Sequence, residues 1–461
     1  MKKLAVIGFI IIMVFACTPK NRVQKSPIET PTTVRTDMPT GEKPTKFTPK
    51  APSKTVEAPT PKTKIPEMVS PAERPTPPLK EKPTAPVAAA RLQMGAEKLN
   101  QYLPILSGLN VAVVVNQTSM IGSRHLVDVL LSQQVAVKTV FAPEHGFRGT
   151  ADAGEQVSSS RDVRTGLPIV SLYGNSKKPS AQQLSGIDLV IFDIQDVGAR
   201  FYTYISTMHY VMEACAENGV KMVVLDRPNP NGHYVDGPVL ESAYQSFVGI
   251  HPIPVVHGMT VGELARMING EGWLKNGMRC DLTVIPCDNY SHRTIYNLPI
   301  KPSPNLPNSR SIYLYPSLCF FEGTAVSIGR GTDKQFQLIG APELSSKKMP
   351  YQFRPVSMEG AKYPKHENKT CYGFDLSTMR LEVFYNQHQL DLKWLIEVYR
   401  DFPSKAEFFN KDNFFDKLAG NSRLRQQIIA GTPEHKIRES WEPALSQFKE
   451  KRKRYLLYPD F

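Results

Sequence analysis

Residues 141–157 read FAPEHGFRGTADAGEQV and bring several reactive side chains to the end of an apolar run. The run stops at Pro143, and Glu144, His145 and Arg148 follow among three glycines. A glutamate at such a position can act as a general acid or a nucleophile, and glycines let a loop approach a ligand closely. We therefore expect Glu144 to be catalytic and His145 and Arg148 to bind substrate. The alternative is a carboxylate that caps a nearby helix or loop.

A second polar segment, FDIQDVGARFYTY at 192–204, supplies further candidates for substrate binding. Arg200 and Tyr202 are expected in the pocket, because a guanidinium matches a carboxylate with two parallel hydrogen bonds. Asp196 stands four residues before Arg200 and could instead pair with it. We expect one of Asp193 and Asp196 to line the pocket and the other to be structural, and the spacing does not decide which.

Two later segments contain the remaining candidates. In HGMTVGELA, His257 is a candidate pocket residue ahead of a helix that Thr260 and Glu263 are expected to cap. In FFEGTAVSIGRGT, Glu322 is our candidate for a second catalytic or sugar-binding carboxylate, and Arg330 for substrate binding. The alternative for this pair is a structural turn with a surface ion pair. The glycines do not form a phosphate-binding loop, since its Lys-Ser/Thr is missing.

The elements that must position these groups follow an alternating pattern. Apolar runs that lack a polar face alternate with helical patterns at 125–132 and 203–218, which predicts a parallel sheet covered on both sides. Ligands of such sheets bind at the carboxyl ends of the strands, where each of these runs ends in polar residues. The runs are VAVVV at 111–115, VKTVF at 137–141, PIVSLY at 168–173, IDLVIFDI at 187–194 and KMVVLD at 221–226.

The pattern changes near residue 290, where turns rich in Pro and Gly replace the regular alternation. We therefore predict an α/β fold with a Rossmann-like domain at 93–290 and a smaller α+β domain at 291–461. A cleft between two such domains is a usual place for a substrate. A dinucleotide cofactor is not expected, because the first run is followed by NQTSMIG rather than a GxGxxG motif.

The N-terminal residues predict export to the cell envelope. MKKLAVIGFIIIMVFAC combines a basic start with an apolar stretch too short to span a bilayer, which is typical of a signal peptide at 1–17. Its end resembles the lipobox of bacterial lipoproteins, in which Cys17 would carry the lipid. An ordinary secretory signal is the alternative. By the same resemblance, Thr18 rather than an aspartate favours the outer membrane, with the protein facing the periplasm.

Residues 18–92 form a tract rich in Pro, Thr and Lys that cannot bury a core. We interpret it as a disordered, extended tether. The chain has a formal charge of +13, of which residues 18–90 and the two N-terminal lysines hold +8, leaving +5 for residues 91–461. That surplus does not favour nucleic acid and is compatible with an anionic polymer. No cofactor or metal is expected, as the sequence has no CxxC pair or His cluster; the other cysteines are interpreted as buried thiols, with a disulfide possible.

Several motifs, taken in order along 93–461, resemble those of the NamZ-type exo-β-N-acetylmuramidases, a family of glycoside hydrolases. The resemblance implies a Rossmann-like domain, a smaller domain with the site between them, and release of N-acetylmuramic acid from the non-reducing ends of peptidoglycan fragments. It also implies that Glu144, in PEHG, is catalytic. The motifs are FAPEHGFRG, GLPIVSLYG, FDIQDVGARFYTY, LDRPNPNG, GPVLE, PIPVVHGMTVGELA, PSPNLPN and FEGTAVSIGRGT.

The chain departs from the family pattern at Ala325 and Ile328, where relatives carry Asn and Glu. The rival hypothesis from another class is a non-catalytic lipoprotein that binds peptidoglycan and tethers the envelope. A periplasmic esterase or amidase is less favoured, because the GxSxG elbow is missing.

Overall fold

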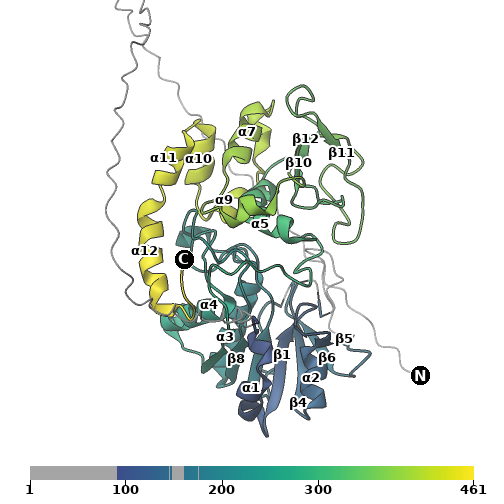
Figure 1. The fold of residues 1–461 in the computed structure, drawn as a ribbon, viewed down its shortest axis with the longest axis vertical. Coiled ribbons are helices and arrows are strands. Elements are labelled where there is room, and N and C mark those ends of the chain that lie inside the picture. The colour runs from purple at the N-terminus through teal and green to yellow at the C-terminus, as the bar shows by residue number, and fades with distance from the viewer. Residues whose placement is uncertain (1–90, 145, 148–159, 175) are drawn as a thin grey trace, which may run out of the picture. The chain divides into compact units, whose positions relative to one another are not determined.

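The computed structural model describes residues 91–144, 146–147, 160–174 and 176–461 (Figure 1). The expected signal peptide with Cys17, nearly all of the expected tether, His145 and Arg148 therefore lie outside the described residues.

A central sheet confirms the predicted parallel architecture. Seven strands run in the order β5-β6-β4-β1-β7-β8-β9, and every neighbouring pair is parallel except β5 with β6. Each of the five apolar runs noted in the sequence forms a strand. The bounds are β1 Asn110–Val115, β4 Ala136–Ala142, β5 Ser160–Arg161, β6 Pro168–Ser171, β7 Leu189–Asp193, β8 Lys221–Leu225 and β9 Leu282–Ile285.

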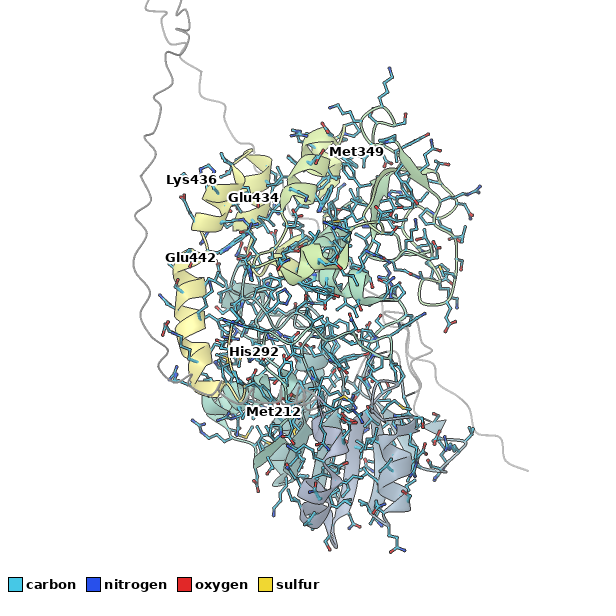
Figure 2. The ribbon with its side chains drawn as sticks, viewed as in Figure 1. Met212, His292, Met349, Glu434, Lys436 and Glu442 are labelled. Carbon is cyan, nitrogen blue, oxygen red and sulfur yellow. The ribbon has the colours of Figure 1, made fainter. Side chains whose placement is uncertain are left out.

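Both faces of this sheet are buried, as apolar strands require. On β1, Val111, Val113 and Val115 join a cluster with the helices at 99–106 and 126–132. Ala112 and Val114 point the other way, into a cluster that contains Met212 of the helix at 204–218 (Figure 2). That second cluster continues without a break into residues 306–448, so the N-terminal and C-terminal parts of the fold share one core.

Capping residues mark the ends of two helices in the N-terminal part. Thr260 and Glu263 form the expected capping box of α4, with Thr260 Oγ1 accepting from the Glu263 amide at 3.2 Å. Gly219 follows the last residue of α3 as its C-terminal cap, and its φ of 67° is a conformation that glycine adopts easily. The elements are η1 Gly95–Glu97, α1 Leu99–Leu106, β2 Met120–Ile121, β3 Arg124–His125, α2 Leu126–Ser132, α3 Tyr204–Asn218, η2 Ser242–Tyr244, α4 Val261–Gly270 and η3 Lys275–Gly277.

The C-terminal part is α+β, as expected. Its sheet is antiparallel in the order β10-β12-β11, and α10, α11 and α12 stand away from it (Figure 1). The elements are α5 Ser309–Leu318, η4 Cys319–Gly323, β10 Leu338–Ala341, β11 Tyr351–Phe353, β12 Cys371–Asp375, α6 Leu381–Tyr385, α7 Lys393–Asp401, α8 Lys405–Phe408, α9 Phe414–Ala419, α10 Arg423–Ile429, α11 Glu434–Glu439, α12 Glu442–Arg452 and η5 Lys453–Tyr455.

The last residues of the chain return to the N-terminal part and bind a buried carboxylate, Asp226. Its side chain accepts from Thr260 Oγ1 at 2.7 Å, from the Gly262 amide at 2.8 Å and from Tyr458 OH at 2.5 Å. Burial raises the pKa of Asp226 to about 6. Nearby, the His292 amide donates to the carbonyl oxygen of residue 459 at 3.1 Å (Figure 2). The end of β8, the start of α4 and the C-terminal tail are thereby joined.

A buried ion pair fixes the next strand end. Asp193, the last residue of β7, accepts from Arg227 Nε at 2.5 Å and from Nη2 at 2.9 Å. Both side chains are almost completely buried. If one partner of such a buried pair loses its charge, the other charge is left buried and unpaired, and the protein is strongly destabilised.

Asp193→Asn should therefore lower the free energy of unfolding by about 3–5 kcal/mol, because it leaves the buried Arg227 without a carboxylate. Chemical denaturation of the purified folded part would measure this loss. Glu439→Gln, which breaks the exposed Lys436–Glu439 pair, is the control and should leave the transition unchanged. Equal stability of Asp193→Asn and the unmodified protein would contradict the structural role.

Candidate active site

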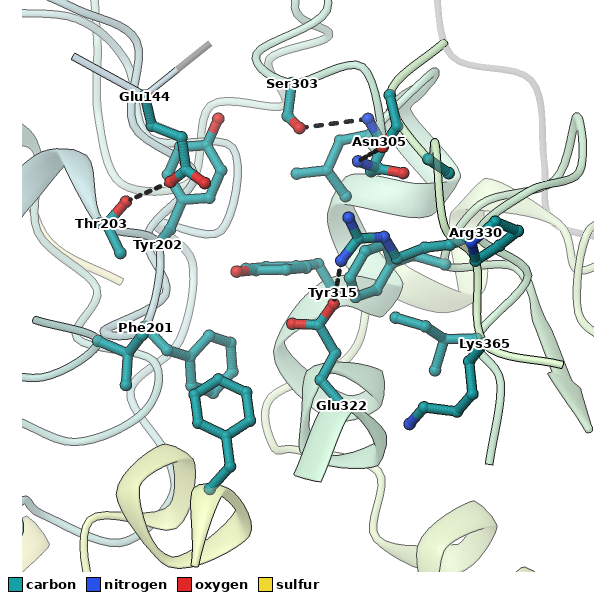
Figure 3. Close-up of a pocket in the computed structure, with 18 of the residues that line it drawn as sticks. Glu144, Phe201, Tyr202, Thr203, Ser303, Asn305, Tyr315, Glu322, Arg330 and Lys365 are labelled. Carbon is teal, nitrogen blue, oxygen red and sulfur yellow. Dashed lines mark hydrogen bonds and ion pairs between the residues drawn. The ribbon is translucent and has the colours of Figure 1, made fainter. Parts of the chain in front are cut away.

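The main pocket has a volume of about 730 Å³ and lies where the N-terminal and C-terminal parts meet (Figure 3). One wall comes from positions 144 and 173, which follow β4 and β6, from 201–204 at the start of α3, and from 247 and 248 in the segment between η2 and α4. The other wall comes from positions between 303 and 365, with position 414 of α9. The cleft predicted between a Rossmann-like part and a smaller part is therefore present.

Glu144 stands just beyond β4, and two hydroxyl groups orient its carboxylate. Tyr173 OH donates to Oε1 at 3.0 Å. Thr203 Oγ1 donates to Oε2 at 2.9 Å (Figure 3). Tyr173 follows β6, and Thr203 precedes the first residue of α3. Three separate elements thus meet at one carboxylate, at the edge where the parallel sheet was expected to place a site.

Two further tyrosines link this wall to the segment at 301–306. Tyr202 OH donates to the Pro302 carbonyl at 2.7 Å, and Tyr204 OH lies 3.4 Å from both that carbonyl and the Glu144 carbonyl. Burial raises the pKa of both tyrosines, so their hydroxyls remain neutral donors. Tyr202 lines the pocket, where the sequence had placed it.

Glu322 and Arg330 occupy the wall opposite Glu144 (Figure 3). Arg330 Nη1 lies 2.9 Å from Glu322 Oε1, and both side chains are partly exposed to the pocket. The ion pair considered as an alternative therefore exists, and it lies within the candidate site. Tyr315 and Cys319 precede Glu322 by about two turns and one turn on the same helical segment, and the Cys319 thiol lies 3.8 Å from Glu322 Oε2.

The opposed carboxylates give the pocket the groups needed for acid–base chemistry on a glycosidic bond. A glycosidase uses either a pair of carboxyl groups that flank the scissile bond or one acid together with a group of the substrate. Glu144, held by neutral hydroxyls, and Glu322, paired with Arg330, differ in environment in the way that separate roles require. Within the described ranges no three His, Cys, Asp or Glu side chains are grouped for a metal.

The structure does not bring Asp193, Asp196 or His257 into the pocket. Asp193 pairs with Arg227, as described above. Asp196 accepts from the Gly198 amide at 2.6 Å, and burial raises its pKa to about 7. His257 lies 3.9 Å from Asp196, and burial, with the charge of Arg452, lowers its pKa to about 3. These three side chains stabilise the loops that lie behind the pocket wall. An Asp or His can stabilise a loop or contact a ligand, and the residue type alone does not show which.

Arg200 also lies behind the wall rather than in it. Its Nη1 donates to the carbonyls of Pro238 at 2.7 Å and Ile253 at 2.8 Å, and its Nη2 donates to that of Leu418 at 2.8 Å. The side chain is fully buried, and burial lowers its pKa to about 9. The sequence spacing had suggested an ion pair between Asp196 and Arg200. Among the described residues, these two side chains do not contact each other. Arg200 therefore anchors backbone instead of binding substrate.

Several residues of the site were missed in the sequence. Thr203 and Tyr173 bind Glu144, and Tyr315 packs edge-on against Tyr202 with ring centroids 5.8 Å apart. Tyr173 ends the apolar run at 168–173, so the pattern had placed it at the edge of the sheet without naming it as a site residue. For the other two the only signals were their neighbours, since Thr203 adjoins Tyr202 and Tyr315 shares a helical face with Glu322. Lys365 had no signal, because it lies in an irregular segment.

Two family models match most of the chain, and together they cover both walls of the pocket. Residues 111–310 match the N-terminal domain of the exo-β-N-acetylmuramidase NamZ, and residues 313–458 match its C-terminal domain. The chain belongs to the NamZ family. The boundary between the two NamZ matches falls at 310–313, whereas our prediction placed it at 290–291.

Characterised and solved relatives cover nearly the same region. The chain is 39% identical over 385 residues to the peptidoglycan β-N-acetylmuramidase NamZ of Bacillus subtilis strain 168, covering 80% of this chain and 92% of that protein. A DUF1343 family protein of Bacteroides fragilis NCTC 9343 shares 47% identity and a TM-score of 0.75, covering 81% of this chain and all of that one. A second, from the same strain, shares 29% identity and a TM-score of 0.70, covering 80% and 99%.

Arg200→Lys should lower kcat for a muramic acid glycoside on the order of 10²-fold, because one ammonium group cannot hold carbonyls of three separate segments and the pocket walls would shift. Steady-state kinetics beside a melting curve would test this. The matched control is Arg438→Lys: Arg438 joins Asp236 to Leu390 and Glu434 away from the pocket. The control should lose stability but keep kcat. Normal turnover by Arg200→Lys would refute the positioning role.

Proposed function

We propose that this protein is an exo-acting glycoside hydrolase that releases N-acetylmuramic acid from the non-reducing ends of peptidoglycan fragments in cell-wall turnover. The observation that carries this proposal is Glu144, held by Tyr173 and Thr203 and facing Glu322 across the pocket in a chain of the NamZ family. The family match and the Bacillus subtilis relative support the same reaction.

Glu144 is assigned the proton transfer. As the acid it donates a proton to the glycosidic oxygen, and the leaving sugar departs as an alcohol. Attack at the anomeric carbon then comes either from Glu322, directly or through a water molecule that it deprotonates, or from the acetamido oxygen of the substrate itself. In each route water supplies the new hydroxyl group of the released N-acetylmuramic acid. The hydroxyls of Tyr173 and Thr203 fix the direction in which the Glu144 oxygens point. Both routes use the same acid, so the proposal does not depend on the choice.

The positive charge of the opposite wall suits N-acetylmuramic acid, whose lactyl group carries a carboxylate. Arg330 and Lys362 line this wall. The Arg330 guanidinium, which pairs with Glu322, has further N–H groups that can bind the substrate carboxylate. A planar guanidinium binds a carboxylate well, because it can donate two parallel hydrogen bonds to it. N-acetylglucosamine lacks that carboxylate and should bind less well. The expected preference is therefore for muramic acid glycosides.

Glu144→Gln should reduce release of N-acetylmuramic acid by on the order of 10² to 10⁴-fold, because the amide cannot donate a proton as an acid. Gln is nearly isosteric and still accepts from Tyr173 or Thr203, so the melting transition and sugar binding should survive. The assay uses a chromogenic muramic acid glycoside with its glucosamine analogue beside it.

Glu450→Gln, on the exposed face of α12, is the matched control and should retain full turnover. A Glu144→Gln variant with near-normal turnover would remove Glu144 from the mechanism. If the unmodified protein binds muramic acid fragments and hydrolyses none, the non-catalytic peptidoglycan-binding alternative would replace the proposal.

We further propose that the protein is lipid-anchored through Cys17 and sits in the outer membrane facing the periplasm. The lipobox-like end of the N-terminal segment and the long tract that follows support this placement. No helix in the part of the chain that the structure describes is long and apolar enough to cross a bilayer. A lipid and a tether would let the folded part reach cell-wall fragments.

Cys17→Ser should move the protein from the membrane fraction to the soluble fraction, because it removes the thiol that would carry the lipid. Fractionation of cells without detergent, followed by immunoblotting, measures this directly. The variant should keep its activity on small glycosides. If the variant still requires detergent for extraction, the lipid anchor is elsewhere or absent.

A further inference from the structure

An exposed tyrosine stands at the mouth of the pocket and has no part in the chemistry described so far. Tyr363 is 83% exposed, yet it is one of the residues that line the pocket. It belongs to residues 360–365, here called the rim loop, all of which line the same pocket. A single exposed ring is ordinary on a protein surface, so it is the position of Tyr363 at the edge of the pocket that points to a ligand.

The rim loop is fixed at its first end. Asn305 Nδ2 donates to the Gly360 carbonyl at 2.7 Å, and Met358 and Ala361 exchange backbone hydrogen bonds at 3.2 and 3.0 Å. Gly360 has a φ of 81° and lies so close to Pro304 that an added Cβ would be 2.5 Å from its side chain. The loop therefore turns tightly against a neighbouring wall segment.

Its other end is fixed to the wall that carries Glu322. The partly buried Lys365 side chain donates through its ammonium to the carbonyls of Thr324 and Val326, the latter at 3.2 Å. The next residue, His366, places Nε2 2.6 Å from the Ala325 carbonyl. With both ends held, the backbone at Tyr363 is ordered while its ring remains in solvent.

Such an arrangement is pre-organised for binding. A ring held on a fixed backbone loses little conformational freedom when a ligand covers it, so more of the contact energy appears as affinity. The Lys362 ammonium lies 5.8 Å from the centre of the Tyr363 ring and adds donors beside it. An aromatic face with polar donors at its edge matches the alternating C–H face and hydroxyl rim of a pyranose ring.

We propose that Tyr363, with Lys362 at its edge, forms a subsite for the sugar to which N-acetylmuramic acid is linked, on the leaving-group side of the scissile bond. This inference rests on the proposed function and extends it. Muramic acid occupies the pocket between Glu144 and Glu322, so the rest of the glycan must leave through the mouth, which the rim loop borders. The occupant is therefore the next sugar of the same fragment.

Two substrates separate this subsite from the catalytic pocket. The first is the disaccharide of N-acetylmuramic acid β-linked to N-acetylglucosamine, and the second is the methyl β-glycoside of N-acetylmuramic acid, whose aglycone is too small to reach the ring. Released N-acetylmuramic acid is quantified by chromatography for both. Tyr363→Ala should raise KM for the disaccharide about five- to tenfold, the size of one aromatic contact, with kcat little changed. Its kinetics on the methyl glycoside should equal those of the unmodified protein.

Tyr363→Phe should restore the disaccharide KM, because it keeps the ring. Ile295→Ala, which removes an exposed apolar side chain away from the pocket, should change nothing. An unchanged disaccharide KM in Tyr363→Ala overturns the subsite alone, and so does an equal loss on both substrates. Failure of the unmodified protein to release N-acetylmuramic acid from either substrate would instead overturn the proposed function, and the subsite with it.

Discussion

A buried guanidinium that donates to three backbone carbonyls holds the walls of the pocket together. Arg200 joins carbonyls of Pro238, Ile253 and Leu418, and the last of these belongs to helix α9 of the C-terminal part. Residues 201–204 follow it directly and line the pocket, while α9 packs against η4, where Phe415 leaves no room for a side chain at Gly323. One side chain therefore couples the position of Thr203, beside Glu144, to that of Glu322.

This coupling matters because the two carboxylates belong to different parts of the fold. Misplacing a catalytic group by about 1 Å can cost a glycosidase on the order of 10²-fold in rate, and neither part alone contains both groups. The continuous core, the aromatic contact between Tyr202 and Tyr315, and the return of the C-terminal tail to Asp226 all limit relative movement of the walls. The shape of the pocket thus depends on how the N-terminal and C-terminal parts pack against each other.

The sequence predicted the sheet and the location of the chemistry better than it predicted contacts. Apolar strands that alternate with helices permit few arrangements, so the parallel sheet and the placement of Glu144 at its edge followed from pattern alone. The roles of Asp193, Arg200 and His257 did not follow, because spacing along the chain does not reveal which side of a loop faces the ligand. Lys365 and Tyr363 lie in irregular segments, where no periodicity indicates what they contact.

The segment at 192–204 shows why polar residues near a site are ambiguous. Asp193 is buried and pairs with Arg227, and Arg200 is buried and donates to backbone carbonyls, whereas Tyr202 and Thr203 face the pocket. Strand-end loops are irregular, so their backbone groups cannot all pair within a sheet and need side chains to satisfy them. A binding loop thus requires two sets of polar residues, one for the ligand and one for the loop itself. Only the first set can vary with substrate, because loss of the second set moves the whole wall.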